Sequence, residues 1–190
     1  MLPELLQSPN LFYLLHCIDI DLAEQQKLAG CPFCGGPLHH SNYQRKPRGG
    51  PDKLPEEFCI RFSFCCGNEK CRRRTLPPSA LFMGRRVYFG GVILIVLTLR
   101  QKNSHEHSKA GLKRLFGVSR KTISRWQIFY QDIFPLSGQW QRLRGLISSV
   151  VRNDKLPSTL VDYFAQHVRS AEEAIINCLR FLAGGMKFTK

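Results

Sequence analysis

The sequence predicts an α+β fold that is mainly helical, in which a cysteine-rich segment with short strands is followed by a series of helices. Cysteine, glycine, proline and basic residues are concentrated between residues 31 and 78, a composition typical of loops and short strands. On both sides of that segment, apolar residues recur at helical spacing. With 43% hydrophobic and 22% charged residues, the chain can bury enough apolar surface to fold.

The N-terminal segment, residues 1–30, is expected to form two helices. Amphipathic patterning covers residues 5–17 and 19–29, and Asp19 or Asp21 is suited to cap the second helix. Gly30 should end that helix, because glycine readily adopts the left-handed backbone found at helix ends.

Four cysteines then fall in two pairs, Cys31 with Cys34 and Cys66 with Cys71. Each pair can bring two thiolates around a tight turn. Two such pairs complete the closed tetrahedron of sulfur ligands that a structural Zn²⁺ prefers. The spacing therefore predicts a four-cysteine zinc ribbon at 31–78.

Within the ribbon, an exposed basic loop is expected at 42–51 and a strand at 58–66, where apolar and polar residues alternate. Alternation along this strand places Cys66 on the same face as Phe64. We therefore favour Cys66 over its neighbour Cys65 as a zinc ligand, and Cys65 remains the rival.

Other cysteine and histidine residues are weaker candidates for ligands. His39 and His40 could replace a thiolate, whereas Cys17, Cys59 and Cys178 have no partner spacing and should be buried apolar residues. The alternatives for the four paired cysteines are reduced core thiols or a redox-active pair. The redox motif is less consistent with the sequence, because no βαβ unit surrounds the first pair.

Two features bear on the cellular compartment. The first ten residues lack the basic and apolar regions of an export signal, so a reducing cytoplasm is favoured for the eight cysteines. The apolar run at 87–99 has fewer residues than the roughly 18 that a membrane-spanning helix needs. We expect a buried helix there, weakened locally by Gly90 and Gly91, and no membrane partner.

Helical patterns at 105–116 and 120–134 are joined by a short turn, which predicts a helix-turn-helix domain at 79–135. Gly117 permits a left-handed backbone, Val118 can pack between the helices, and the hydroxyl of Ser119 can cap the second helix.

Ile123 and Trp126 should face the core of this domain. The side chains that point outward carry hydrogen-bond donors, which DNA phosphates and base edges accept. This pattern is typical of a helix that lies in a major groove. These outward side chains are Lys113, Arg114, Ser119, Arg120, Lys121, Thr122, Ser124 and Arg125. The alternative is an ordinary helical hairpin with a solvated polar face.

Positive charge is concentrated on these two regions. The chain has 28 basic and 14 acidic residues, a net charge of +14. Residues 1–30 carry one lysine against four acids, whereas residues 31–86 carry eleven basic residues against four acids. The ribbon contributes Arg72, Arg73 and Arg74. Such a field favours a polyanion as partner.

No catalytic centre is evident. Asp132, Asp154, Asp162, Glu172 and Glu173 lie without strands that would gather them around Mg²⁺. One enzymatic alternative remains, a nicking site built from a histidine pair and a tyrosine nucleophile. Its members would be His105 and His107 with Tyr130 or Tyr163. No phosphate-binding loop or nucleophile elbow is present.

The two cysteine pairs, the run Cys71-Arg72-Arg73-Arg74-Thr75 and the run Gly117-Val118-Ser119-Arg120-Lys121-Thr122 resemble the N-terminal DNA-binding part of zinc-ribbon transposases of insertion sequences. The resemblance covers residues 31–126. It implies recognition of element ends or of an operator, by a small accessory protein of a mobile element. The acidic catalytic core of full transposases is missing, so strand transfer would need a partner.

The leading hypothesis is therefore a zinc-dependent protein that binds double-stranded DNA in the bacterial cytoplasm, associated with the nucleoid. Its second partner would be a transposase or another mobile-element protein. Helices expected at 138–151 and 170–183 complete a C-terminal region at 136–190, for which homodimerisation is the suggested role. The alternatives are a cryptic transposase or nuclease subunit and a zinc-ribbon adaptor that docks a protein such as RNA polymerase.

Overall fold

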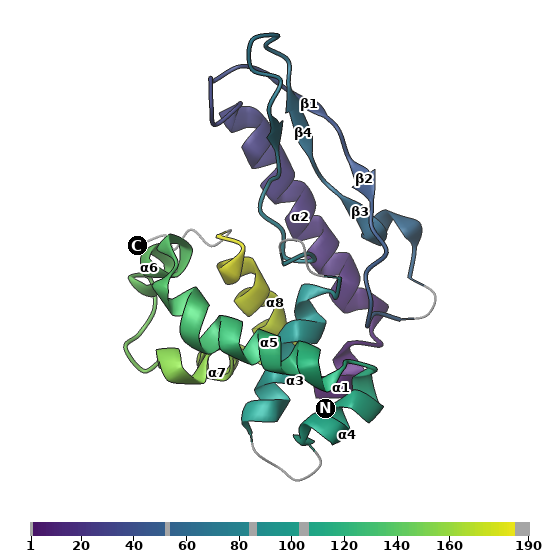
Figure 1. The fold of residues 1–190 in the computed structure, drawn as a ribbon, viewed down its shortest axis with the longest axis vertical. Helices are drawn as coiled ribbons and strands as arrows, with labels where there is room; N and C mark the ends of the chain where they lie inside the picture. The colour runs from purple at the N-terminus through teal and green to yellow at the C-terminus, as the bar shows by residue number, and fades with distance from the viewer. Residues whose placement is uncertain (1, 52–53, 84–86, 103–106, 185–190) are drawn as a thin grey trace.

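A computed structural model describes residues 2–51, 54–83, 87–102 and 107–184. The fold is α+β and mainly helical, as predicted. One long helix, α2 (Pro9–Ala29), lies beside the strands of the cysteine-rich segment at one end of the molecule, and the remaining helices gather around its other end (Figure 1).

The N-terminal segment forms a short α1 (Leu2–Leu5) and the continuous α2, so the prediction of two helices divided near Asp19 was wrong. Asp19 is 1% exposed and lies in the middle of α2. Its carboxylate accepts hydrogen bonds from the hydroxyl of Ser79 and the backbone N–H of Ala80. A residue typical of a helix cap is thus used for a tertiary contact. Gly30 ends α2 with φ +77°, as predicted.

The cysteine-rich segment contains two small antiparallel sheets. One has the strand order β1 (Leu38–His40), β4 (Phe64–Cys66) and β5 (Arg74–Thr75). The other pairs β2 (Tyr43–Gln44) with β3 (Ile60–Arg61). The loop expected at 42–51 therefore includes a strand.

The strand expected at 58–66 was also only partly right. A 3-10 helix, η1 (Glu56–Cys59), occupies its start, and Phe62 and Ser63 separate β3 from β4. The backbone N–H of Ser63 donates to the side-chain oxygen of Asn42 at this break, so the chain can change from one sheet to the other.

The apolar run forms α3 (Gly90–Gln101), and all its residues from Gly90 to Leu99 are buried, as predicted. Gly90 has a packing role, because a Cβ atom at this position would lie 2.9 Å from the carbonyl oxygen of Ala80. Among the described residues, no helix combines the length and apolar character needed to cross a bilayer.

The rest of the chain is helical. Its elements are α4 (Lys109–Phe116), α5 (Arg120–Ile128), the π-helical η3 (Phe129–Ile133), η4 (Phe134–Leu136), α6 (Gly138–Arg144), η5 (Asn153–Lys155), α7 (Ser158–Ala165) and α8 (Ala171–Leu182). The sequence predicts one helix over 120–134, whereas α5 ends at Ile128 and the chain continues as the π-helical η3. Helix α6 stops at Arg144, well short of residue 151.

Two hydrophobic cores result. The larger surrounds α3, includes Leu11, Phe12 and Leu15 of α2, and extends to α8. The smaller contains Ala23 of α2 with Phe64 and the cysteines Cys31 and Cys66. Helix α2 belongs to both cores, so it positions the cysteine-rich segment relative to the helical part.

Candidate metal centre and basic surfaces

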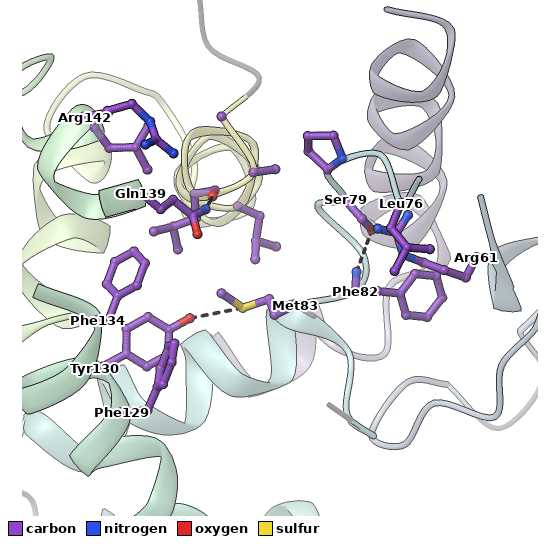
Figure 2. A pocket seen from close by; sticks show the side chains of 16 residues that line it. Arg61, Leu76, Ser79, Phe82, Met83, Phe129, Tyr130, Phe134, Gln139 and Arg142 are labelled. Carbon is purple, nitrogen blue, oxygen red and sulfur yellow. Dashed lines mark hydrogen bonds between the residues drawn. The ribbon is translucent and has the colours of Figure 1, made fainter. Parts of the chain in front are cut away.

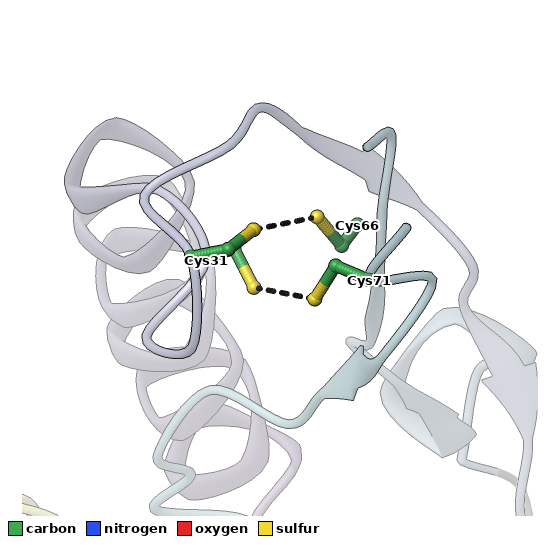
Figure 3. A group of neighbouring side chains, drawn as sticks. Cys31, Cys66 and Cys71 are labelled. Atoms are coloured by element: carbon green, nitrogen blue, oxygen red, sulfur yellow. Dashed lines mark hydrogen bonds between the residues drawn. The ribbon is translucent and has the colours of Figure 1, made fainter. Parts of the chain in front are cut away.

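Two turns bring the four paired cysteines together (Figure 3). Cys31 and Cys34 lie in the turn that follows α2, and Cys66 ends β4. The Sγ atoms of Cys31, Cys34, Cys66 and Cys71 all lie within 4.8 Å of one another. Two of these distances are 3.5 Å, between Cys34 and Cys66, and 3.8 Å, between Cys31 and Cys71. Thiolates sharing a tetrahedral metal ion at about 2.3 Å lie about 3.8 Å apart. The cluster could therefore hold one metal ion.

The first turn is shaped by backbone hydrogen bonds. The N–H of Cys31 donates to the carbonyl of Gly36 at 2.9 Å, and that of Gly35 donates to the carbonyl of Cys31 at 2.8 Å. Gly35 has φ +71°, where glycine is favoured. A Cβ atom on Gly36 would lie 3.3 Å from the sulfurs of Cys34 and Cys66, so glycine leaves the sulfurs room to converge.

The second turn lies between Cys66 and Cys71, which are farther apart in the sequence than Cys31 and Cys34. The N–H groups of Cys71 and Arg72 both donate to the carbonyl of Asn68 at 2.9 Å. Arg72 then adopts φ +47°. The side-chain oxygen of Asn68 accepts the N–H of Lys70, which further fixes the turn. The two residues by which this pair exceeds the first are thus accommodated by a local turn, and the Cys71 sulfur reaches the cluster.

Cys66 belongs to the cluster and Cys65 does not, as predicted. Cys66 is fully buried, whereas the Cys65 thiol points toward the carbonyl of Arg72 at 3.6 Å. In the sheet, Cys65 pairs with His39 and Arg74, and neither histidine of β1 is part of the cluster. The prediction that the three remaining cysteines are buried holds for Cys178 only, since Cys17 and Cys59 are half-buried.

The thiols of Cys31 and Cys66 differ in pKa. Burial opposes ionisation of the Cys31 thiol, but hydrogen bonds from the backbone N–H groups of Phe33 and Cys34 and from the thiols of Cys66 and Cys71 together outweigh it and lower the Cys31 pKa to about 7. Burial raises the pKa of Cys66 to about 12. Near neutral pH one thiolate forms readily, and four thiolates in this space would need the charge of a cation. Four converging thiols, of which Cys31 and Cys66 are buried, therefore form a donor set that could hold a metal ion.

The three arginines of the cysteine-rich segment that were predicted to contact DNA, Arg72, Arg73 and Arg74, are exposed. The Arg73 guanidinium lies 4.7 Å from the ring centroid of Phe33, and that of Arg74 lies 5.6 Å from the ring centroid of Tyr43. Arg74 also donates to the hydroxyl of Ser41 at 3.0 Å. Aromatic rings therefore support two of these cations at the surface.

Helices α4 and α5 are joined by Gly117, Val118 and Ser119, with the local structure that the sequence predicts. Gly117 is left-handed with φ +65°. The hydroxyl of Ser119 accepts the N–H of Thr122 and caps α5. Val118, Ile123 and Trp126 are buried. The two helices are therefore fixed relative to each other by the core.

The predicted contact residues on these helices divide into two groups. The basic side chains are exposed, namely Lys113, Arg114, Arg120, Lys121 and Arg125. The hydroxyl groups are engaged within the protein. Ser119 bonds with Thr122, and Ser124 donates to the carbonyl of Arg120 and accepts a hydrogen bond from Lys109 at 2.8 Å. Lys109 was not predicted to lie at this surface, because its α4 position alone does not reveal its contact with α5.

The acidic residues weighed for catalysis do not form a metal site within the described ranges, where the four cysteines are the sole group suited to a metal. Asp154 pairs with Arg152 at 2.6 Å, and Asp162 pairs with Lys102 at 3.6 Å. Tyr130 is 1% exposed and donates to the sulfur of Met83, so its hydroxyl is poorly placed for a nucleophile.

Only part of the alternative nicking site, a histidine pair with a tyrosine nucleophile, lies within the described residues. His105 lies outside the described residues, and His107 is half-buried just before α4. Tyr163 packs against His167 in the C-terminal region, with ring centroids 4.7 Å apart.

Comparisons with protein families, with curated proteins and with solved structures found no match to this chain.

Proposed function

We propose that this protein binds double-stranded DNA through two basic surfaces, one on the α4–α5 pair and one on a zinc ribbon. In this proposal the metal held by the four cysteines is Zn²⁺, whose preference for a closed tetrahedron of thiolates fits the donor set. The α4–α5 pair acts as a helix-turn-helix, and α5 is the recognition helix.

The main support is the division of α5 into two faces. At 100° per residue, Arg120, Lys121 and Arg125 fall within one arc, and all three are exposed. Ile123 and Trp126 occupy the opposite arc and are buried. A rigid helix with a cationic outer face can enter a DNA major groove. Its basic side chains would contact the phosphates first and the base edges second.

The ribbon contributes the second surface. Arg73 and Arg74 lie on aromatic rings near the metal cluster, and the α4–α5 pair lies near the other end of α2 (Figure 1). The 21 residues of α2 span roughly 32 Å, close to one turn of B-form DNA. A duplex that contacts both surfaces would follow the long axis of the molecule.

A salt titration tests the proposal directly. Fluorescence anisotropy with a labelled duplex of about 30 base pairs should show affinity falling steeply between 50 and 200 mM salt. Four or five phosphate contacts correspond to a logarithmic slope of about −4. A slope near zero contradicts DNA binding through these surfaces.

We propose an accessory or regulatory role in a mobile element, without catalysis by this chain. The resemblance to zinc-ribbon transposases supports it, together with the lack of a carboxylate cluster among the described residues. Pure protein incubated with supercoiled plasmid and Mg²⁺ or Mn²⁺ should leave the plasmid intact. Nicking that Tyr163→Phe abolishes would instead favour the enzymatic alternative.

A protein-binding role is a second candidate, favoured by exposed apolar side chains beyond α5. Ile128, Ile133 and Leu136 are 52%, 54% and 80% exposed. Such residues are suited to a homodimer contact or to a transposase partner. Light scattering of the wild type and of Ile133→Asp distinguishes these cases, because loss of a dimer in the variant identifies self-association.

A further inference from the structure

A cavity of about 860 Å³ lies between the C-terminal helices and the segment that leads from the ribbon to α3 (Figure 2). Its volume falls in the range of small-molecule sites, about 300 to 1,000 Å³. The α4–α5 pair and the metal cluster do not line it. The cavity is therefore separate from both surfaces of the proposed function.

One wall is aromatic and continues directly from α5. Phe129 and Tyr130 belong to the π-helical η3, and Phe134 follows in η4. Isolated π turns are frequent at functional sites, where they redirect side chains. Leu179 and Leu182 of α8 complete an apolar lining.

Most polar groups of the lining are already paired. The hydroxyl of Tyr130 donates to the sulfur of Met83 at 3.2 Å, and the amide of Gln139 donates to the carbonyl of Leu182 at 2.6 Å. The hydroxyl of Ser79 donates to the carboxylate of Asp19. These bonds fix the shape of the wall and leave its surface largely apolar.

The charged residues that line the cavity are two arginines, Arg61 and Arg142. Arg61 is 6% exposed, donates to the carbonyl of Pro77 and interacts electrostatically with Asp19, so it is compensated within the protein. Arg142 is exposed at the rim on α6, on the same side as Gln139 (Figure 2). Within the described part of the chain, no acidic residue lines the cavity. The cavity thus combines an apolar interior with a cation at its mouth.

We propose that this cavity binds a small amphiphilic anion, with its apolar body against Phe129, Phe134 and Leu179 and its anionic head at Arg142. A carboxylate, sulfate or phosphate head would satisfy the same guanidinium. This inference is independent of the proposed DNA binding.

Three probes with the same ten-carbon body test the head-group preference, namely decanoate, decanol and decyltrimethylammonium, each below its micellar concentration. Binding is followed by tryptophan fluorescence, because the chain has two tryptophans and the Trp140 and Phe134 ring centroids lie 5.4 Å apart. Decanoate should bind with a Kd at least tenfold below that of decanol. Decyltrimethylammonium should bind most weakly.

Variants identify the site. Arg142→Gln should raise the Kd for decanoate about tenfold and leave that for decanol unchanged, whereas Arg142→Lys should keep most of the affinity. Arg180→Gln is the matched control, because Arg180 is exposed on α8 and does not line the cavity. The proposal is overturned if decanoate gives no saturable signal, if the cationic probe binds equally well, or if Arg142→Gln binds decanoate like the wild type.

Discussion

The Asp19 carboxylate, in the middle of α2, accepts a hydrogen bond from the backbone N–H of Ala80 at 2.5 Å. It also accepts hydrogen bonds from the hydroxyl of Ser79 and the N–H of Leu81. This contact connects the long helix to the segment between the cysteine-rich sheets and α3. Burial raises the Asp19 pKa from 3.8 to about 6, although the hydrogen bonds and Arg61 oppose this shift.

The raised pKa of Asp19 predicts a pH dependence of stability. Between pH 3.8 and about 6, the folded protein keeps a proton that the unfolded chain releases. The stability that Asp19 contributes is therefore fully present well below pH 3.8, declines above that pH, and is lost as the pH rises through about 6. The free energy of unfolding of the wild type, relative to Asp19→Asn, should fall by about 2 kcal/mol between pH 4 and pH 7, because the unfolded chain is already partly ionised at this residue at pH 4. Urea titrations of both proteins measure this difference. A difference that is constant with pH contradicts the assignment to Asp19.

The cluster geometry predicts that Cys66 and Cys65 respond differently to the same substitution. For the proposed zinc site of one ion per chain, Cys66→Ser should reduce the bound zinc to well below half an ion per chain. It should also lower the Tm by about 10 °C or more, because a structural metal contributes several kcal/mol. Cys65→Ser should bind zinc like the wild type, since the Cys65 thiol lies outside the cluster. Elemental analysis and thermal unfolding provide the measurements. Equal metal loss in both variants would show that the ligand set is different.

Two glycines that follow helices provide a test of the α4–α5 turn. Gly117 has φ +65°, and a Cβ atom at this position would meet no other described atom within 4 Å. Gly117→Ala should therefore destabilise the protein by about 1 to 2 kcal/mol through backbone strain alone. Gly145 has φ −69°, and a Cβ atom there would make an ordinary contact at 3.9 Å. Gly145→Ala should stabilise the protein by about 0.4 to 1 kcal/mol. Chemical denaturation measures both changes, and a neutral Gly117→Ala would count against the left-handed turn.

Single charge removals on α5 should change the salt dependence of DNA binding by a predictable amount. Arg125→Gln should reduce the steepness of the logarithmic salt slope by about 1 and weaken binding to all duplexes, if this side chain contacts one phosphate. Arg169→Gln removes the same charge from an exposed position before α8 and should leave the slope unchanged. Equal effects of the two substitutions would indicate that only the net charge matters.

Local chemistry explains which parts of the molecule could be predicted from the sequence. The turn at Gly117 and the cap at Ser119 depend on neighbouring residues, and the structure has both. The choice of Cys66 over Cys65 follows from alternation along one strand, which is also a local property. The buried α3 follows from its uninterrupted apolar run.

Features that depend on distant partners were missed. Asp19 resembles a helix cap in the sequence, but its partners are Ser79 and Ala80, about 60 residues away. Strand β2 was expected to be an exposed loop, because its partner β3 is far along the chain. Helix α7 was not predicted and packs mainly on α8, so its position depends on the tertiary fold.

The shared helix α2 also limits how this protein can be divided. Its first half contributes Leu11 and Leu15 to the helical core, and its second half contributes Ala23 to the core beside the metal cluster. A cut between the two halves would leave each fragment with an uncovered apolar stripe. The cysteine-rich segment is therefore not an independent unit, and a graft that moves it to another protein has to include the whole of α2.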